Sequence, residues 1–110
     1  LAFQLGVLYW QRRELDKAQS ELELAIQINP NYSNARYILG LVHDARGDEA
    51  AAKLEFFEVE RLNPENEEIK RILANLENGL PALDGIDIAE PPISQAPPEI
   101  QEQASPEGDQ

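Results

Sequence analysis

Residues 5–30 of the chain, LGVLYWQRRELDKAQSELELAIQINP, return 34 positions later as a related stretch at residues 39–64, LGLVHDARGDEAAAKLEFFEVERLNP. A third, shorter copy begins to match at Leu73-Ala74. Self-similarity at a fixed period of about 34 residues is typical of a solenoid built from helix-turn-helix units. The repeat therefore predicts an all-α fold of this solenoid type. The agreeing pairs are Leu5 and Leu39, Gly6 and Gly40, Ala18 and Ala52, Leu22 and Phe56, and Pro30 and Pro64.

Each of the two full copies predicts a pair of helices. In the second helix of the first copy, Ala18, Leu22 and Ala25 follow the three-and-four spacing of one buried stripe. That helix stops at Asn29-Pro30, because the residue before a proline is pushed out of the helical region. The four predicted helices are residues 1–12, 15–28, 33–47 and 48–62, with Ser33 and Asp48 as N-caps of the last two and Gly47 at the end of the third.

These helices divide the chain into units. Repeat 1 covers residues 1–32 and is truncated at its N-terminal end, repeat 2 covers residues 33–64, and one further helix lies within residues 65–80. No sixth helix is predicted after it, so we interpret this fifth helix as a capping helix. The chain contains no Met and opens on Leu1 inside a repeat, which leads us to expect a piece of a longer protein.

The composition changes at Pro81. Residues 81–110 hold six of the eight prolines and seven acidic residues, with no basic residue. A segment with few apolar groups and one sign of charge cannot offset the entropy lost on ordering, so we predict a disordered, acidic, Pro-rich tail. Residues 80–88 have an alternative, which is to fold back over the last helix. The apolar residues that favour it are Leu80, Leu83, Ile86 and Ile88.

The charge excludes several classes of partner. The formal net charge is −12, divided as −5 over residues 1–80 and −7 over residues 81–110. Nucleic acid and anionic membrane surfaces both require clustered Lys and Arg, so we expect neither as a partner. No apolar run approaches the roughly 18 residues of a membrane span. The absence of Cys removes disulfides and thiolate metal sites and leaves the cellular compartment open.

The alternation of small and large residues indicates close helix packing. Gly6 and Gly40 are expected where helix backbones approach most closely, since a larger residue at such a junction overfills it. The pattern resembles the tetratricopeptide repeat family over residues 1–80. It is carried by Leu5, Gly6, Tyr9, Ala18, Leu22, Ala25 and Pro30 in the first copy and by Leu39, Gly40, Ala52, Phe56 and Pro64 in the second. The chain departs from the family pattern at His43, Val59 and Glu77, and Glu77 fits the exposed face of a capping helix.

The resemblance implies a concave groove, lined by the first helix of each unit, that receives a peptide or a partner helix. We hypothesise that Trp10, Tyr37 and Leu41 hold an apolar segment, because aromatic anchors are favoured at protein interfaces. In the alternative interpretation these side chains pack on one another or on a neighbouring repeat. The predicted groove residues are Phe3, Val7, Trp10, Tyr37, Leu41, Asp44 and Arg71, with Gln11, Asn34, Glu68 and Asn75 at neighbouring groove positions.

One ligand class of the resembled family is not expected. A branch of that family grips the terminal carboxylate of chaperone tails with Lys, Asn and Arg. The matching positions here are Phe3, Val7, Ile38, Glu68 and Ile72, and none of them carries the required residue type.

No catalytic, cofactor-binding or metal-binding residue is predicted. His43, the only histidine, falls on a packing position, and its neighbour Asp44 points in another direction on the helix. No phosphate-binding loop, paired-histidine motif or nucleophile elbow is present. The predicted function is therefore a non-catalytic protein–protein interaction scaffold. The alternative is an accessory C-terminal domain of a larger bacterial membrane protein, because Leu76 to Ile86 followed by Pro91-Pro92-Ile93 is similar to the ends of some polysaccharide-ligase-like proteins.

Overall fold

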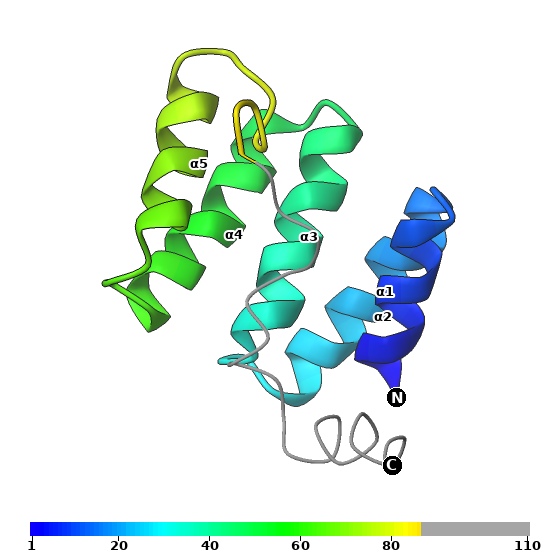
Figure 1. Ribbon diagram of the computed structural model, residues 1–110. Helices are drawn as coiled ribbons and strands as arrows, with labels where there is room; N and C mark the ends of the chain where they lie inside the picture. The colour runs from blue at the N-terminus through cyan, green and yellow to red at the C-terminus, as the bar shows by residue number, and fades with distance from the viewer. Residues whose placement is uncertain (87–110) are drawn as a thin grey trace, which may run out of the picture.

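The computed structural model of the chain describes residues 1–86, and the regular structure within them consists of five α-helices (Figure 1). This confirms the predicted all-α helical-repeat fold. The predicted tail from residue 87 onward lies outside the described residues. In chain order the helices are α1 (Ala2–Gln11), α2 (Leu15–Ile28), α3 (Ser33–Ala45), α4 (Glu49–Leu62) and α5 (Glu67–Glu77).

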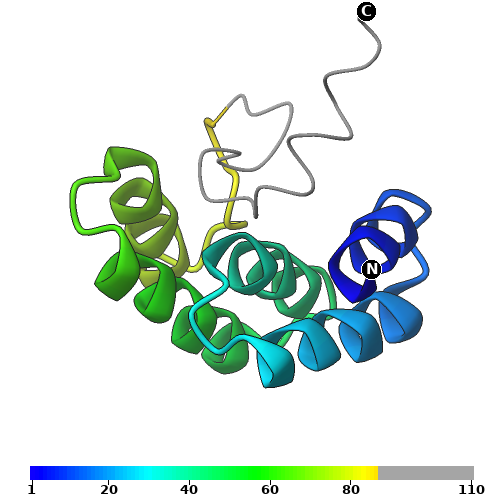
Figure 2. The same cartoon turned by 90° about the horizontal axis from the view of Figure 1, so that it is seen from below.

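The helices stand in two curved rows. Figure 2 shows α1, α3 and α5 along the inner, concave side, with α2 and α4 along the outer, convex side. Each helix packs on the next one along the chain, and α1 also contacts α3. We call the first set the inner row and the second the outer row, and we call the concave surface of the inner row the inner face.

The hairpin turns have the same backbone form in both repeats. Arg13 and Gly47, which occupy the same position in successive repeats, both adopt the left-handed conformation, with φ of 62° and 83°. This conformation costs about 1–2 kcal/mol for a residue with a Cβ atom, so glycine suits the second turn better than arginine suits the first. In each turn the next amide donates to a carbonyl of the preceding helix, from Glu14 to Tyr9 and from Asp48 to His43, both at 2.9 Å.

Side-chain caps fix the start of α4 and α5. Asp48 accepts a hydrogen bond from the Ala51 amide at 3.2 Å, as the sequence predicts. Asn66 accepts two, from the amides of Glu68 and Ile69 at 2.9 and 3.2 Å. Each cap satisfies amide groups that have no partner within the first turn of a helix.

The start and end of α3 differ from the prediction. The N-cap is Tyr32, so Ser33 is the first helical residue and the predicted Ser33 cap is wrong by one position. The helix ends at Ala45, because Arg46 and Gly47 already form the turn.

The glycines of the repeat lie where the two helices of each hairpin touch. A Cβ atom on Gly6 would lie 2.7 Å from the Leu22 side chain, and one on Gly40 would lie 2.7 Å from the Phe56 ring. Neither position has room for a side chain without movement of a fully buried neighbour. Of the other repeat residues, Ala18, Ala25, Leu39 and Ala52 are buried, Leu5 and Tyr9 are half-buried, and Pro30 and Pro64 are exposed.

An ion pair also ties α3 to α4. The Arg36 guanidinium contacts the Glu55 carboxylate at 2.9 Å, with both side chains less than one-fifth exposed. Arg36 donates a second hydrogen bond to the Pro30 carbonyl at 2.8 Å. This second bond holds the loop between the two hairpins.

Residues 80–86, which we call the strap, follow α5 as two tight turns packed against α3 and α5. Ala82 is fully buried, and Leu83 and Ile86 pack partly on the core. Within the strap the Asp84 amide donates to the Pro81 carbonyl at 3.0 Å and the Ile86 amide to the Leu83 carbonyl at 2.9 Å. The predicted start of the tail at residue 81 is therefore too early, and the fold-back alternative describes these residues better.

Candidate functional site

The predicted groove residues all lie on the inner row, at positions that recur once in every repeat. One recurring position carries Phe3, Tyr37 and Arg71 on α1, α3 and α5; a second carries Val7, Leu41 and Asn75; a third carries Trp10 on α1 and Asp44 on α3. The helical repeat thus brings side chains from three separate parts of the sequence to one face. Along that face the residue types change from apolar on α1 to polar on α5.

The rings of Phe3 and Tyr37 have packing partners within the chain. Phe3 is 8% exposed and lies against the Tyr32 ring, with ring centroids 4.8 Å apart. Tyr37 is 1% exposed and meets the Phe56 ring edge-on, at a centroid distance of 5.8 Å. These two residues are therefore core residues of the inner row, and the contribution of Tyr32 is not predicted by the sequence pattern.

Two polar atoms on α3 are buried without a hydrogen-bond partner among the described residues. They are the Tyr37 hydroxyl and the Asn34 side-chain oxygen. Burial raises the pKa of the Tyr37 hydroxyl well above its ordinary value, and the nearby Glu68 carboxylate raises it further. The hydroxyl is therefore a neutral group at physiological pH, able to donate one hydrogen bond.

Val7 and Trp10 are partly exposed apolar residues of α1, in the inner row. Both are half-buried and pack against the core cluster, while Leu41, the equivalent of Val7 on α3, is 6% exposed. The Arg13 guanidinium lies 4.4 Å from the centre of the Trp10 ring, a cation–π contact that covers part of the indole.

The polar end of the inner face holds the strap. Asp44 on α3 accepts a hydrogen bond from the Ala82 amide at 3.1 Å. The Asn75 side-chain amide on α5 donates to the carbonyls of Ala82 and Asp84, both at 2.9 Å. The Arg71 guanidinium donates to the Gly85 carbonyl at 3.4 Å. Two predicted groove residues, Asp44 and Arg71, thus contact a segment of the chain itself.

Residues 1–86 were also searched for metal-binding clusters and membrane-spanning helices. Across residues 1–86, no three His, Cys, Asp or Glu side chains gather in an arrangement that could hold a metal ion. Within the same range no helix is long and apolar enough to cross a membrane. His43 lies half-buried near the end of α3.

Comparison with known proteins identifies the repeat. Residues 1–32 match the family model for the tetratricopeptide repeat. No match was found among curated proteins or among solved structures. Repeats of this family are typically non-catalytic modules of protein–protein interaction. The matched segment contains the first hairpin, and the second hairpin carries glycine, alanine and proline at the equivalent positions. Residues 1–32 are therefore similar to a tetratricopeptide repeat, and the second hairpin follows the same pattern of residues.

Proposed function

We propose that this chain is a non-catalytic interaction scaffold that binds an apolar segment of a partner protein on its inner face, at Val7, Trp10 and Leu41. The observation that carries the proposal is the partly exposed Trp10 on α1, a helix of the inner row in an array built from interaction repeats. Trp is enriched among the residues that dominate binding energy at protein interfaces, because it buries a large area with few rotatable bonds.

The charge of the chain specifies the partner further. The formal net charge is −12, and Asp44 and Glu68 lie on the inner row. Like charges brought together at an interface oppose binding and slow the encounter. The favoured partner segment is therefore apolar with a neutral or basic flank.

A fluorescence screen tests this proposal. Trp10 is the only tryptophan, so its emission reports on the inner face alone. The probes are synthetic 12-residue peptides, apolar at the centre, with basic, neutral or acidic flanks. We expect the basic and neutral sets to change the emission and the acidic set to leave it unchanged.

Two variants locate the binding surface. Replacing Trp10 by Ala should weaken the binding of a peptide hit about thirtyfold, which corresponds to about 2 kcal/mol, as is typical for a central aromatic anchor. Leu54→Ala is the matched control, since Leu54 is 66% exposed on the outer row. Both affinities are measured by titration calorimetry. An equal loss in the two variants, or a loss in neither, would remove the inner face as the binding surface.

The alternative role, as an accessory domain of a larger membrane protein, stays a prediction. Apolar membrane spans in any gene sequence that precedes Leu1 would support it. Further repeats of the same period there would favour the scaffold.

A further inference from the structure

The strap lies on the inner face in the manner of a bound peptide. Figure 2 shows this segment on the concave side of the array, beside α5 and α3. Each of the three side chains that hold it, Asp44, Arg71 and Asn75, belongs to the inner row. None of them contacts a side chain of the strap in these bonds, because all four hydrogen bonds go to main-chain amide or carbonyl groups.

Such contacts select the shape of a polypeptide rather than its sequence. Main-chain groups are present in every peptide, so a clamp of this kind accepts any segment that can form the same turn. The exception is the position of Ala82, which is fully buried and leaves room only for a small side chain. The ligand class that fits this clamp is a turn-forming segment with a small residue at its centre.

The residues of the clamp occupy the recurring positions that we propose for partner binding elsewhere on the inner face. Asp44 corresponds to Trp10, and Asn75 corresponds to Leu41, each pair sharing one position in successive repeats. A partner segment that runs along the inner row from α1 towards α5 therefore meets Asp44 and Asn75 with the strap already on them.

The strap is only partly buried. Ala82 is fully buried and Leu83 and Ile86 pack partly on the core, whereas Leu80 is 42% exposed and Pro81, Asp84 and Gly85 are exposed. Segments with little buried apolar surface open at a lower free energy than the core of the same protein.

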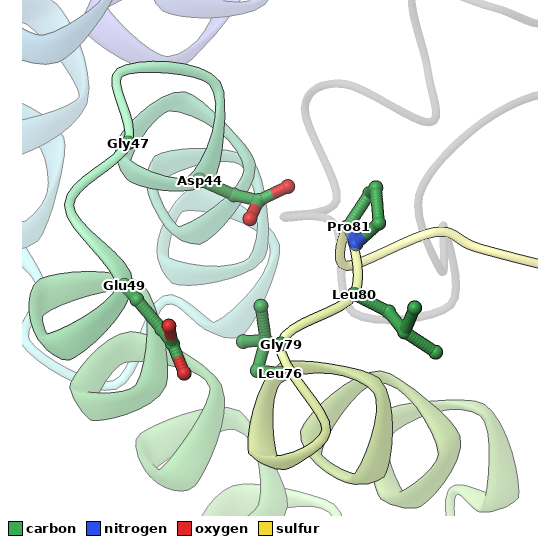
Figure 3. Close-up of a pocket in the computed structure, with 7 residues that line it drawn as sticks. All are labelled: Asp44, Gly47, Glu49, Leu76, Gly79, Leu80 and Pro81. Atoms are coloured by element: carbon green, nitrogen blue, oxygen red, sulfur yellow. The ribbon is translucent and has the colours of Figure 1, made fainter.

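A left-handed turn at Gly79 joins the strap to α5. Gly79 has a φ of 74°, and a Cβ atom built on it would meet nothing within 4 Å. Gly79, Leu80 and Pro81 border an open hollow of about 270 Å³. Figure 3 shows the Asp44 carboxylate across from Pro81. The amides of Gly79 and Leu80 donate to the carbonyls of Leu76 and Asn75 at 3.1 and 2.9 Å, so the strap begins after this hydrogen-bonded turn.

We propose that the strap is an intramolecular competitor: it occupies the α3–α5 half of the inner face as a ligand in cis, and a partner segment gains that half only when the strap swings out. This inference rests on the proposed function and adds its regulation. An occupied site lowers the apparent affinity for a partner by the fraction of molecules in which the site is open.

Hydrogen exchange tests the opening without any partner. The amide of Ala82 donates to Asp44, so it exchanges only when the strap is released or the whole domain unfolds. We expect this amide to exchange at least about tenfold faster than the slowest amides of α3, because local opening bypasses global unfolding. Exchange at the same rate as those amides, with the same response to denaturant, would make the strap a permanent part of the core and overturn the proposal.

A peptide supplied in trans tests the clamp as a binding site. The probe is the blocked peptide GLPALDGI, which reproduces residues 79–86. The variant Ala82→Glu places a carboxylate at the buried position beside Asp44 and should release the strap from the full chain. Leu80→Glu adds the same charge at a position that is 42% exposed and serves as the matched control.

We expect millimolar peptide to shift the NMR signals of the Asn75 side-chain amide in Ala82→Glu, and to leave wild type and Leu80→Glu unchanged. A peptide hit from the fluorescence screen should also bind Ala82→Glu about tenfold more tightly than wild type. Two results would overturn the proposal that the strap competes for the inner face. One is an equal response to the peptide in all three proteins. The other is no response in Ala82→Glu while its helical circular dichroism is retained. The peptide probe is a segment of the chain itself, so a failure of this test does not bear on the proposed partner binding. Equally, a failed partner screen does not affect the test of the strap.

Discussion

At the scale of single residues, the contact between the two helices of a hairpin depends on the absence of a side chain. Gly40 lies against the Phe56 ring, which has no exposed surface. Gly6 and Leu22 form the equivalent contact in the first hairpin. The helix propensity lost by placing glycine inside a helix, about 1 kcal/mol, is offset by the closer approach of the helices.

Replacing Gly40 by Leu should therefore destabilise the domain. Overfilling a packed junction costs about 1–3 kcal/mol, and each kcal/mol lowers the Tm of a domain of this size by about 4–8 °C. Thermal unfolding followed by circular dichroism measures the shift. Ala45→Leu on the same helix is the control, because Ala45 is exposed and its replacement should leave Tm nearly unchanged. A melting curve of Gly40→Leu that overlays wild type would disprove the packing role.

The Tyr37 hydroxyl gives a second prediction at this scale. It is buried without a hydrogen-bond partner among residues 1–86, so Tyr37→Phe should change the free energy of unfolding at pH 7 by less than about 1 kcal/mol, or increase it. A much larger loss of stability would show that the hydroxyl has an essential partner.

The same substitution should alter the response to alkaline pH. The folded-state pKa of Tyr37 is raised, by burial first and by Glu68 second. The unfolded chain therefore ionises first, near the ordinary pKa of about 10, so the contribution to stability is complete below that pH and is lost as the pH rises above it. Urea unfolding between pH 8 and pH 11 should show a smaller loss for Tyr37→Phe than for wild type or the control Tyr9→Phe. Identical slopes in all three proteins would contradict the assignment.

At the scale of helices, each element begins and ends through a few specific hydrogen bonds. The cap of α5 is the strongest case, since one Asn66 oxygen accepts from two amides. The helix that follows it carries Asn75 and Arg71, two of the three side chains that hold the strap. The cap therefore supports the end of the inner row on which the strap rests.

Asn66→Ala should lower the free energy of unfolding by about 1 kcal/mol, as is typical for the loss of an N-cap side chain. Urea titration followed by circular dichroism measures the change. Glu65→Ala, at an exposed neighbouring position, is the control and should be close to neutral. If both substitutions have the same effect, the capping bonds contribute nothing measurable.

The sequence predicts the helices well because their signals are local and repeated. Apolar spacing, the two Asn-Pro stops and the Asp48 cap each act within a few residues, and the observed helices agree with the predicted ranges to within about two residues. The strap gives no such signal. Its place depends on bonds from distant side chains, such as Asp44, to main-chain groups that every residue has. The inner-face positions follow from the period of the repeat, but which of them meet Tyr32, Phe56 or the strap depends on tertiary packing.

At the scale of the whole molecule, the same repeat position has a different environment according to its place in the stack. Val42 on α3 is fully buried, whereas Leu8, the equivalent residue of the preceding repeat on α1, is 44% exposed. Each unit of a solenoid packs only on its neighbours, so burial at a position depends on which units flank it.

Matched substitutions at these two positions should therefore differ. Val42→Asn should lower the free energy of unfolding by more than about 2 kcal/mol, because it removes a buried apolar group and buries an amide in its place. Leu8→Asn should lower it by less than about 1 kcal/mol. Chemical denaturation of the two variants measures both values, and equal losses would show that Leu8 is as tightly enclosed as Val42.

The change of residue type along the inner row has a consequence for orientation. Phe3 and Val7 on α1 give way to Arg71 and Asn75 at the same repeat positions on α5. A polypeptide lying along this surface would meet apolar side chains at one end. At the other end it would meet side chains that donate hydrogen bonds to its main-chain carbonyls. The two possible N-to-C directions of the bound chain are then not equivalent, so the array would distinguish a segment from one with the same residues in reverse order.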